Sequence, residues 1–469
     1  MRIAMRTCWI HALNFVYGER FLIGSSLVRI GFGIVMLLFY CMHYQQRYFL
    51  WFAGGALDSK MYDEGIFTIY QFATSPLIFN ILFYLGILVT IVYILGYKGR
   101  VISILFFLFT YSILQRNGLL QDGGDNLLRV LLIYMMFMQT TAYFSFDAKK
   151  FWEKRQNSVD EQKYRLSALF HNFAVLCCII QVCILYFTAG IYQTMGDLWN
   201  QGTALYYIMQ VDQFSMPLLK NILSGHEHAL VIGTYFSILI KLAFPFLLFN
   251  RKTKCFAVAT IALFHLGIAF GMGLITFSAI MIIADLMIIS DKDYQKLYCG
   301  GMKLKAFVCI KMTSFFRKLR QNRRIRMQQI TVFYDGWCPF CTRTIHKIQK
   351  LDFLKLIHFV SFRTEGIIQS NQLSIELLEK MIHSKKEGDE DLKVGIHSFI
   401  QISKRVLPMW GLLPILYLSV WCGFGQQLYK FIANRRIIIP GGGCNGSEEC
   451  KINFDKNIQS KFHYTCSLT

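Results

Sequence analysis

Long apolar runs separated by short polar segments fill the first 290 residues of the chain. A transmembrane helix needs about 20 consecutive, largely apolar residues to cross the hydrocarbon core of a bilayer. The pattern predicts a polytopic α-helical membrane domain of about eight spans over residues 1–295, of which the third run is short for a span. The predicted spans are 21–40, 77–95, 101–115, 127–145, 168–190, 229–249, 255–271 and 273–290.

The pattern changes after residue 295. Residues 303–326 contain nine Lys and Arg side chains and no acidic one, so 296–327 is interpreted as a basic juxtamembrane linker. Such a segment either lies against anionic cytoplasmic lipid or forms an ordinary solvated helix. From Gln328 onwards, "QQITVFYDG" predicts a buried strand that ends in a turn, and "PFCTRTIHKIQKL" predicts a helix. We therefore expect a small α/β domain over 328–469.

The charges of the loops predict the topology. Counted over alternate loops of the eight-span arrangement, Lys and Arg number fourteen on the side of the N-terminus and four on the opposite side. Cytoplasmic loops of membrane proteins carry the excess of basic residues. We therefore expect a multi-pass protein of the cell membrane with both termini in the cytoplasm, and no cleavable signal precedes the first run.

Composition supports a bilayer rather than nucleic acid as the partner of the chain. Hydrophobic residues make up 54% of the sequence and charged residues 16%, compared with roughly 25% charged residues in soluble domains. The formal net charge of +21 is concentrated in short segments between apolar runs, as in polytopic membrane proteins. We expect no nucleic acid partner.

The strongest chemical signal is the C-P-F-C sequence of Cys338 and Cys341. A strand, a tight turn and C-x-x-C at the start of a helix is the thioredoxin-like arrangement. Free N–H groups and the dipole at a helix N-terminus favour a thiolate at Cys338. Pro339 suits the first helical position, where no N–H is needed, and Cys341 lies on the same face to resolve a mixed disulfide. Tyr334, Asp335 and Gly336 form the turn before the pair.

Two other interpretations of the cysteines stay open. Cys444 and Cys450 could complete a four-thiolate zinc site with the C-P-F-C pair, although their separation fits a zinc knuckle poorly. They could instead form a second thiol pair that exchanges electrons with the first. We expect no metal and no cofactor beyond the dithiol itself; a quinone or zinc has no support in the sequence.

"FYDGWCPFC" resembles the DCC family of thiol-disulfide oxidoreductases. The segment 407–436 is similar to the C-terminal helices of that family, with a pattern matched by Tyr429, Asn434 and Arg435. The resemblance covers about residues 329–450 and implies a thioredoxin-like fold. No proline lies between Pro339 and Pro408, so the cis-proline that binds substrate backbone in ordinary thioredoxins has no counterpart.

The apolar part resembles a second family. "RNGLLQDGGDNLLRV", "YFTAGIYQTMGDLWNQGTALYY" and "LFHLGIAFGMGLITFSAIM" are similar to the HTTM domain over residues 15–290. This domain is shared with vitamin K-dependent gamma-carboxylases and with the sporulation-delaying protein B family of toxin maturation. The resemblance implies lysines after the Ala-Gly pair in carboxylases, where this chain has Tyr192 and Gln193. An amide does not titrate, which argues against carboxylation.

Ionisable residues in or next to the apolar runs are further site candidates, because such groups are costly in a membrane unless paired or functional. Lys241 and Asp285 are expected either to neutralise each other or to take part in catalysis, and His265 is a candidate through the HTTM-like motif. Asp122 and Asp125 lie in the loop before the fourth run.

Three functions follow. The first is a membrane-anchored thiol-disulfide oxidoreductase with a cytoplasmic dithiol, in which Cys338 attacks a protein or peptide disulfide and Cys341 resolves it. The alternative is a maturation or export factor for a secreted peptide. The third, a carboxylase-like modifying enzyme, is weakened by Gln193.

Overall fold

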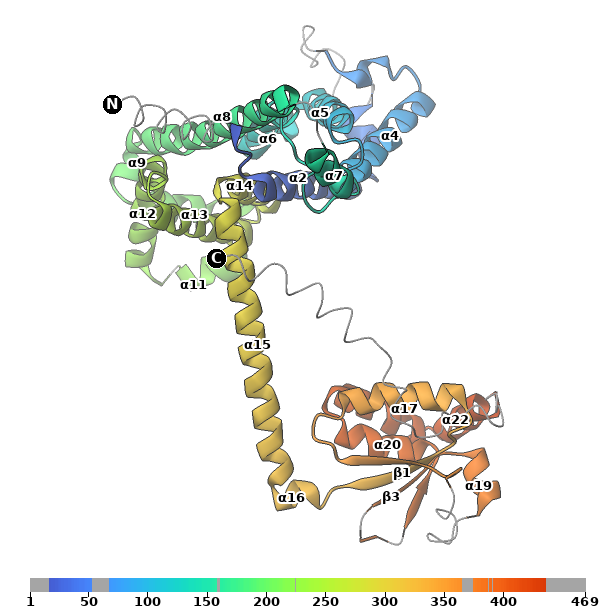
Figure 1. Cartoon of the computed structure of the whole chain (residues 1–469). Helices are drawn as coiled ribbons and strands as arrows, with labels where there is room; N and C mark the ends of the chain where they lie inside the picture. The colour runs from blue at the N-terminus through green and yellow to red at the C-terminus, as the bar shows by residue number, and fades with distance from the viewer. Residues whose placement is uncertain are drawn as a thin grey trace, which may run out of the picture. The chain divides into compact units, whose positions relative to one another are not determined.

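The computed structural model describes residues 17–52, 67–157, 161–223, 225–364, 374–386, 388, 389 and 391–435. The chain divides into two compact units, residues 1–300 and 301–469. The first is a bundle of helices and the second holds a small mixed sheet with helices (Figure 1).

Five helices of the first unit are long and apolar enough to cross a membrane. They coincide with five of the predicted spans, because length and apolarity decide both. Their bounds are α2 Leu22–Met42, α4 Pro76–Leu95, α8 Glu161–Thr194, α12 Glu227–Leu247 and α13 Arg251–Met272.

The prediction of about eight spans is not confirmed. The helices α5 (Gly99–Arg116), α6 (Gly123–Met135) and α14 (Ile275–Asp285) occupy the other three runs, and none meets the length and apolarity of a span. The other short helices of this unit are α3 Arg47–Trp51, η2 Ile69–Phe72, η3 Gly118–Leu120, α7 Ala148–Gln156, α9 Asp197–Asn200, α10 Ala204–Gln210, η4 Asp212–Phe214, α11 Pro217–Leu223 and η5 Leu286–Ile288.

Buried Arg29 explains why the fourth run does not continue as a helix. Its guanidinium donates to the carbonyls of Thr140 and Phe144, after α6, and to Tyr93 and Ile94 at the end of α4. These bonds satisfy carbonyls that an apolar environment would otherwise leave unpaired. Gly96 ends α4 with φ of 70°, and a Cβ there would lie 2.9 Å from the guanidinium carbon of Arg29.

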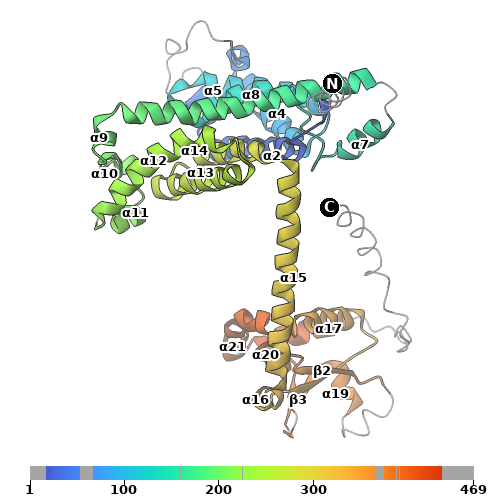
Figure 2. The ribbon, with the colours of Figure 1, turned by 60° about the vertical axis from the view of Figure 1, so that its left-hand side comes forward.

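The bundle packs aromatic and aliphatic side chains inside and leaves others on its outer faces. α2 packs against α4, α8 against α12, and α13 against α14 (Figure 2). Phe32, Phe79, Phe83 and Phe106 are fully buried. Large apolar side chains such as Leu263 are exposed on the span-length helices, as expected where lipid rather than water surrounds a helix.

The predicted basic linker is helical. It lies within α15 (Asp291–Gln321) and the short α16 (Arg323–Arg326). Asp291 begins α15 and accepts from the backbone N–H groups of Leu22 and Ile23, at the start of α2, at 3.1 and 2.8 Å. Its carboxylate therefore caps a helix of the first unit.

The second unit is built on a four-stranded sheet in the order β2-β1-β3-β4. β1 pairs in parallel with β2 and antiparallel with β3, which in turn pairs antiparallel with β4. The bounds are β1 Ile330–Tyr334, α17 Pro339–Leu351, β2 Ile357–Ser361, α19 Ile375–Lys380, β3 His383–Lys386, β4 Leu392–Val394, α20 Ile396–Arg405, η6 Leu407–Leu412, α21 Leu413–Trp421 and α22 Gly425–Asn434.

Alternation along β1 places its side chains on both faces of the sheet. Ile330 and Val332 pack with Ile348 of α17 and Ile402 of α20 on one face. Phe333 packs on the other face with Phe362 and Leu378, the latter from α19. The helices therefore cover both faces, and packing on both sides anchors the end of β1 where the dithiol turn begins.

Candidate functional site

The C-P-F-C pair lies at the N-terminus of a helix that directly follows a strand. β1 ends at Tyr334, and Cys338 is the N-cap of α17 with Pro339 at its first position. The Cys338 Sγ accepts from the backbone N–H of Cys341 at 3.3 Å, and the Thr342 hydroxyl donates to the Cys338 carbonyl at 2.8 Å. The predicted strand–turn–helix arrangement is confirmed.

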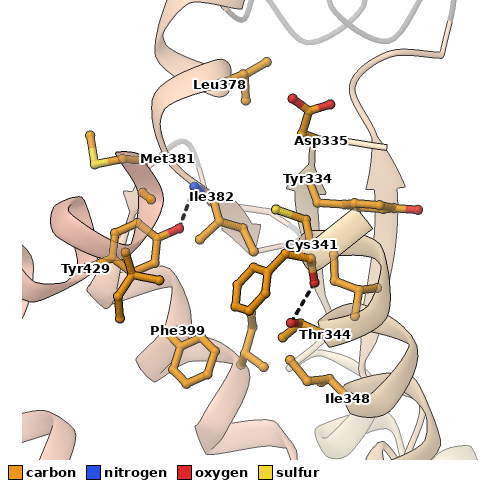
Figure 3. A pocket seen from close by; sticks show the side chains of 15 residues that line it. Tyr334, Asp335, Cys341, Thr344, Ile348, Leu378, Met381, Ile382, Phe399 and Tyr429 are labelled. Atoms are coloured by element: carbon orange, nitrogen blue, oxygen red, sulfur yellow. Dashed lines mark hydrogen bonds between the residues drawn. The ribbon is translucent and has the colours of Figure 1, made fainter. Parts of the chain in front are cut away.

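The two sulfurs have different surroundings. Cys338 has an exposed fraction of 0%, whereas Cys341 is half-buried and lines a cavity of about 90 Å³. Figure 3 shows the Cys341 sulfur on the side of the cavity that faces Ile382. Cys341 is therefore the sulfur that a group in the cavity meets first.

Asp335 organises the turn before the dithiol. Its Oδ1 accepts from the backbone N–H of Trp337 at 3.0 Å. Arg363, which follows β2, donates to both carboxylate oxygens of Asp335 and to Glu379 at 2.8 Å. Its guanidinium also stacks on the Trp337 ring, 4.3 Å from the centroid. The bond to Asp335 is the largest influence that raises the pKa of Arg363 above its usual value.

Close packing favours glycine at position 336. A Cβ at this position would lie 2.5 Å from the Ser361 hydroxyl at the end of β2. Sequence reasoning found Asp335 and Gly336 but missed Arg363. The available signal was a single arginine two residues after the strand "IHFVS".

The cavity wall opposite Cys341 is a backbone segment whose polar groups are already used. The Ile382 N–H donates to the Tyr429 hydroxyl at 3.1 Å (Figure 3), and the Ile382 carbonyl accepts from the Gly395 N–H at 2.9 Å. The Met381 carbonyl lies 2.9 Å from Nδ1 of His383. No cis peptide bond occurs among the described residues. The Ile382 N–H is therefore already used within the domain and is not free for a substrate backbone.

The rest of the cavity is mostly apolar. Side chains from α17, α20 and α22 contribute to it, and Tyr334 and Asp335 reach it from the turn before the dithiol. Burial raises the pKa of Tyr334. Further apolar lining residues are Phe340, Ile348, Leu378, Phe399, Ile402 and Ile432. The cavity therefore favours an apolar group beside Cys341.

The C-terminal residues singled out in the sequence divide into two sets. Tyr429 lines the cavity, Asn434 ends α22, and the Arg435 guanidinium lies 4.2 Å from the centroid of the Phe431 ring. Cys444 and Cys450 lie outside the described residues. Within the described ranges no group of three or more His, Cys, Asp or Glu side chains could hold a metal ion.

Asp122 and Asp125 serve a helix terminus in this structure. The Asp122 carboxylate accepts from the N–H groups of Gly124 and Asp125 at 2.7 and 3.0 Å. Asp125 accepts in return from the Asp122 N–H at 3.2 Å. This reciprocal capping box fixes the start of α6.

Lys241 and Asp285 do not pair with each other. Lys241 Nζ donates to Ser237 at 3.0 Å and lies 5.0 Å from the centroid of the Phe264 ring. Asp285 instead accepts from the Tyr186 hydroxyl at 2.9 Å. The expectation of mutual neutralisation is wrong for this conformation. Lys241 contacts Ser237 one turn earlier in α12 and the ring of Phe264 in α13, whereas Asp285 bonds to Tyr186 of α8.

Tyr186, which sequence reasoning missed, joins Asp285 to His265. The Tyr186 oxygen lies 3.2 Å from His265 Nε2, and all three side chains are at least 98% buried. Within the described part of the chain, His265 Nδ1 and Asp285 Oδ1 have no hydrogen-bond partner.

Gln193 lies near Lys241. Its amide donates to the Ser237 hydroxyl at 3.3 Å, the same hydroxyl that Lys241 contacts. An amide there can position a group but cannot abstract a proton.

Comparison with curated proteins finds two relatives, both from Bacillus subtilis (strain 168). The uncharacterized protein YitO is 27% identical over 209 residues, 43% of this chain and 64% of that protein. The sporulation-delaying protein SdpB is 26% identical over 210 residues, 44% of this chain and 62% of that protein. The match thus spans less than two thirds of either relative. No solved structure matches.

Two protein families match successive parts of the chain. Residues 24–293 match the HTTM domain, and residues 332–441 match the DCC1-like thiol-disulfide oxidoreductases. The order agrees with the apolar bundle and the dithiol unit described above. The protein therefore belongs to the HTTM domain family and carries a C-terminal DCC1-like thiol-disulfide oxidoreductase domain.

Proposed function

We propose that this chain is a membrane-anchored thiol-disulfide oxidoreductase that acts on protein or peptide disulfides through Cys338 and Cys341. The observation that carries the proposal is a cysteine pair at a helix N-terminus, with one sulfur in the wall of an apolar cavity. The DCC1-like match supports it. The two thiols carry the electrons, so the reaction needs no resident cofactor.

The thiol–disulfide exchange conserves atoms and electrons between the cysteine pair and the substrate. One thiolate attacks a sulfur of the substrate disulfide, the other substrate sulfur leaves as a thiolate, and a mixed disulfide forms. The second thiolate of the pair then attacks its neighbour, which releases the remaining substrate thiol and leaves a Cys338–Cys341 disulfide. Two electrons and two protons pass to the substrate, and a cytoplasmic dithiol restores the reduced pair.

The order of attack stays a prediction. Sequence reasoning assigns the attack to Cys338, whose position at the helix N-terminus favours a thiolate. Burial of Cys338 and the position of Cys341 at the cavity favour first contact at Cys341. The two assignments differ in which single serine variant traps the substrate.

The cytoplasmic side is proposed from charge. Counted over the eight runs predicted from the sequence, five of which coincide with span-length helices, the loops on the side of the N-terminus hold fourteen Lys and Arg against four opposite. The basic stretch 303–326 then faces anionic cytoplasmic lipid, with about 1 kcal/mol per basic side chain near the surface. In the cytoplasm such a pair is kept reduced.

The test uses the purified full-length chain in nanodiscs with a disulfide-bonded peptide as substrate. Cys338→Ser and Cys341→Ser should each abolish catalytic turnover, and one of them should accumulate a mixed disulfide that mass spectrometry assigns. Cys309→Ser, which alters an exposed cysteine of α15, is the matched control and should leave turnover unchanged. Turnover retained in the Cys338→Ser/Cys341→Ser double variant would contradict the proposal.

A second candidate is a maturation factor for a secreted peptide, in which the HTTM domain binds the peptide and the dithiol assists. The similarity to the sporulation-delaying protein SdpB favours it. Deleting the protein from its host should remove a mature secreted peptide from the medium, and an unchanged set of secreted peptides would count against it. The carboxylase-like function is less favoured, because Gln193 supplies only an amide. Gln193→Lys without any carboxylation would weaken it further.

A further inference from the structure

The last three helical segments of the second unit, η6, α21 and α22, carry exposed large apolar side chains. Six large side chains that define this apolar hairpin surface are 51–85% exposed: Trp410, Ile415, Leu418, Trp421, Phe424 and Phe431. Monomeric soluble domains rarely expose a contiguous apolar patch of this kind without a partner.

The apolar hairpin has the composition of a membrane span but not the shape of one. Leu407–Trp421 and Gly425–Asn434 together pass the length and hydropathy criteria of a span, yet they meet at an angle of 101°. Gly423 makes the bend with φ of 76°. Each arm is too short to cross about 30 Å of hydrocarbon, so a bent apolar pair of this length suits the interface plane instead.

The rim of the apolar hairpin surface is basic and aromatic. Lys404 Nζ lies 5.5 Å from the Tyr417 ring centroid, and the Arg435 guanidinium lies 4.2 Å from that of Phe431. Basic side chains of this kind cover apolar surface with their stems and keep their charge at the headgroups. Tryptophan and tyrosine are enriched at the same depth of a bilayer.

We propose that the apolar hairpin formed by α21 and α22 docks into the surface of a lipid bilayer. The occupant is lipid because the chain already carries five span-length helices, which keep the dithiol unit close to a membrane. The combination of apolar face, tryptophan and basic rim is typical of interfacial helices. The membrane domain of the same chain and a second copy of the chain are the competing occupants of the apolar hairpin surface.

Docking would place the dithiol at the membrane surface. α22 carries exposed Leu428 and Phe431 on one side, while Tyr429 and Ala433 line the cavity beside Cys341. One helix diameter, about 10 Å, then separates lipid from the cavity. Given the proposed redox function, the preferred substrate class is a disulfide held at or near the bilayer, rather than one in bulk solution.

The test uses the full-length chain in nanodiscs that contain a phospholipid with a photoreactive diazirine in its acyl chain. Mass spectrometry should find labelled peptides from 407–435 as well as from the span-length helices. The double variant Trp421→Glu/Leu418→Glu should lower the 407–435 labelling about tenfold, because each substitution adds a charge to the face that is proposed to enter the bilayer. Leu377→Glu, at a 54% exposed apolar residue of α19, is the matched control and should change nothing.

The outcomes separate docking from catalysis. Reduction of a small soluble disulfide, dithiobis(nitrobenzoate), should be unaltered by the hairpin variants, and reduction of an acyl-anchored disulfide peptide should fall. Labelled spans with an unlabelled 407–435 segment would overturn the proposal. So would hairpin crosslinks to the membrane domain or to a second copy in place of lipid. Loss of the soluble activity in Cys338→Ser or Cys341→Ser alone tests the redox function independently.

Discussion

Arg363 holds both carboxylate oxygens of Asp335, with N–H···O distances of 3.1 and 3.0 Å. Asp335 in turn accepts the N–H of Trp337, one residue before Cys338. A side chain that follows β2 thus fixes the turn that presents the dithiol. Planar, bidentate pairs of this kind are stronger than single charged contacts.

Arg363→Ala should therefore loosen the dithiol turn. We expect a loss of about 2 kcal/mol in the free energy of unfolding, because a hydrogen-bonded and largely buried carboxylate loses its partner, together with slower turnover. Arg363→Lys should restore only part of the stability and part of the turnover, since lysine makes neither the bidentate contact nor the stack on Trp337. Chemical denaturation and disulfide turnover measure the two effects.

The control for that variant is Lys393→Ala, which removes an exposed pair with Asp391. Exposed pairs contribute little, so stability and turnover should stay at the wild-type level. An Arg363→Ala protein as stable and as active as Lys393→Ala would contradict the role given to Arg363.

Tyr429→Phe should release the backbone opposite Cys341. The hydroxyl accepts the Ile382 N–H at 3.1 Å, and its loss leaves a half-buried donor unpaired at a cost of about 1–2 kcal/mol. Hydrogen exchange at the Ile382 amide should accelerate. Tyr298→Phe, at an exposed tyrosine of α15, should leave that amide unchanged.

Ala433→Leu should fill the cavity beside the dithiol. Ala433 lines the cavity of about 90 Å³, so the larger side chain occupies the space proposed for an apolar group of the substrate. We expect a KM for a disulfide peptide raised about tenfold with little change for dithiobis(nitrobenzoate), which has no extended chain to place. Equal effects on both substrates would mean that the cavity does not select.

Tyr186→Phe tests the buried cluster of the membrane domain. It removes the hydroxyl between His265 and Asp285 and leaves both without that partner, at a cost of about 1–3 kcal/mol. Thermal unfolding in nanodiscs should show a lower midpoint. The matched change Tyr93→Phe removes a buried hydroxyl that has no hydrogen-bond partner among the described residues, and should be nearly neutral.

His383 should make the dithiol unit less stable in acid. Burial lowers the pKa of His383 below 6.5, so the unfolded chain binds a proton more readily than the folded one. Its contribution is complete above the unfolded pKa and is lost as pH falls from there through the folded pKa, with a slope of at most about 1.4 kcal/mol per pH unit. In His383→Gln, the opening free energy that hydrogen exchange reports for the amides of β1 and β3 should fall less between pH 7 and pH 5 than it does in the wild-type protein.

Local patterns were sufficient for the dithiol turn and for five helices. The bounds predicted for α17 from "PFCTRTIHKIQKL" match the structure, because Pro339 and the N-cap cysteine determine the helix start from neighbouring residues. Length and apolarity likewise identified α2, α4, α8, α12 and α13.

Tertiary contacts account for what the sequence did not reveal. Arg29 binds carbonyls 111 and 115 residues away, so no local signal ends the fourth apolar run at Met135. Tyr186 reaches Asp285 across 99 residues, and Arg363 reaches Asp335 across 28. Each partner is visible only once the helices and strands are placed.

The backbone at Met381–Ile382 bears on how the proposed oxidoreductase would distinguish its substrates. Both backbone polar groups of Ile382 make hydrogen bonds within the domain. Discrimination between substrates would therefore rest on the side chains that line the cavity, such as Phe399 and Ile402. Substitutions of those side chains would change the shape of the cavity and leave the cysteine pair in place, so under the proposed function the choice of substrate is set by other residues than the redox chemistry.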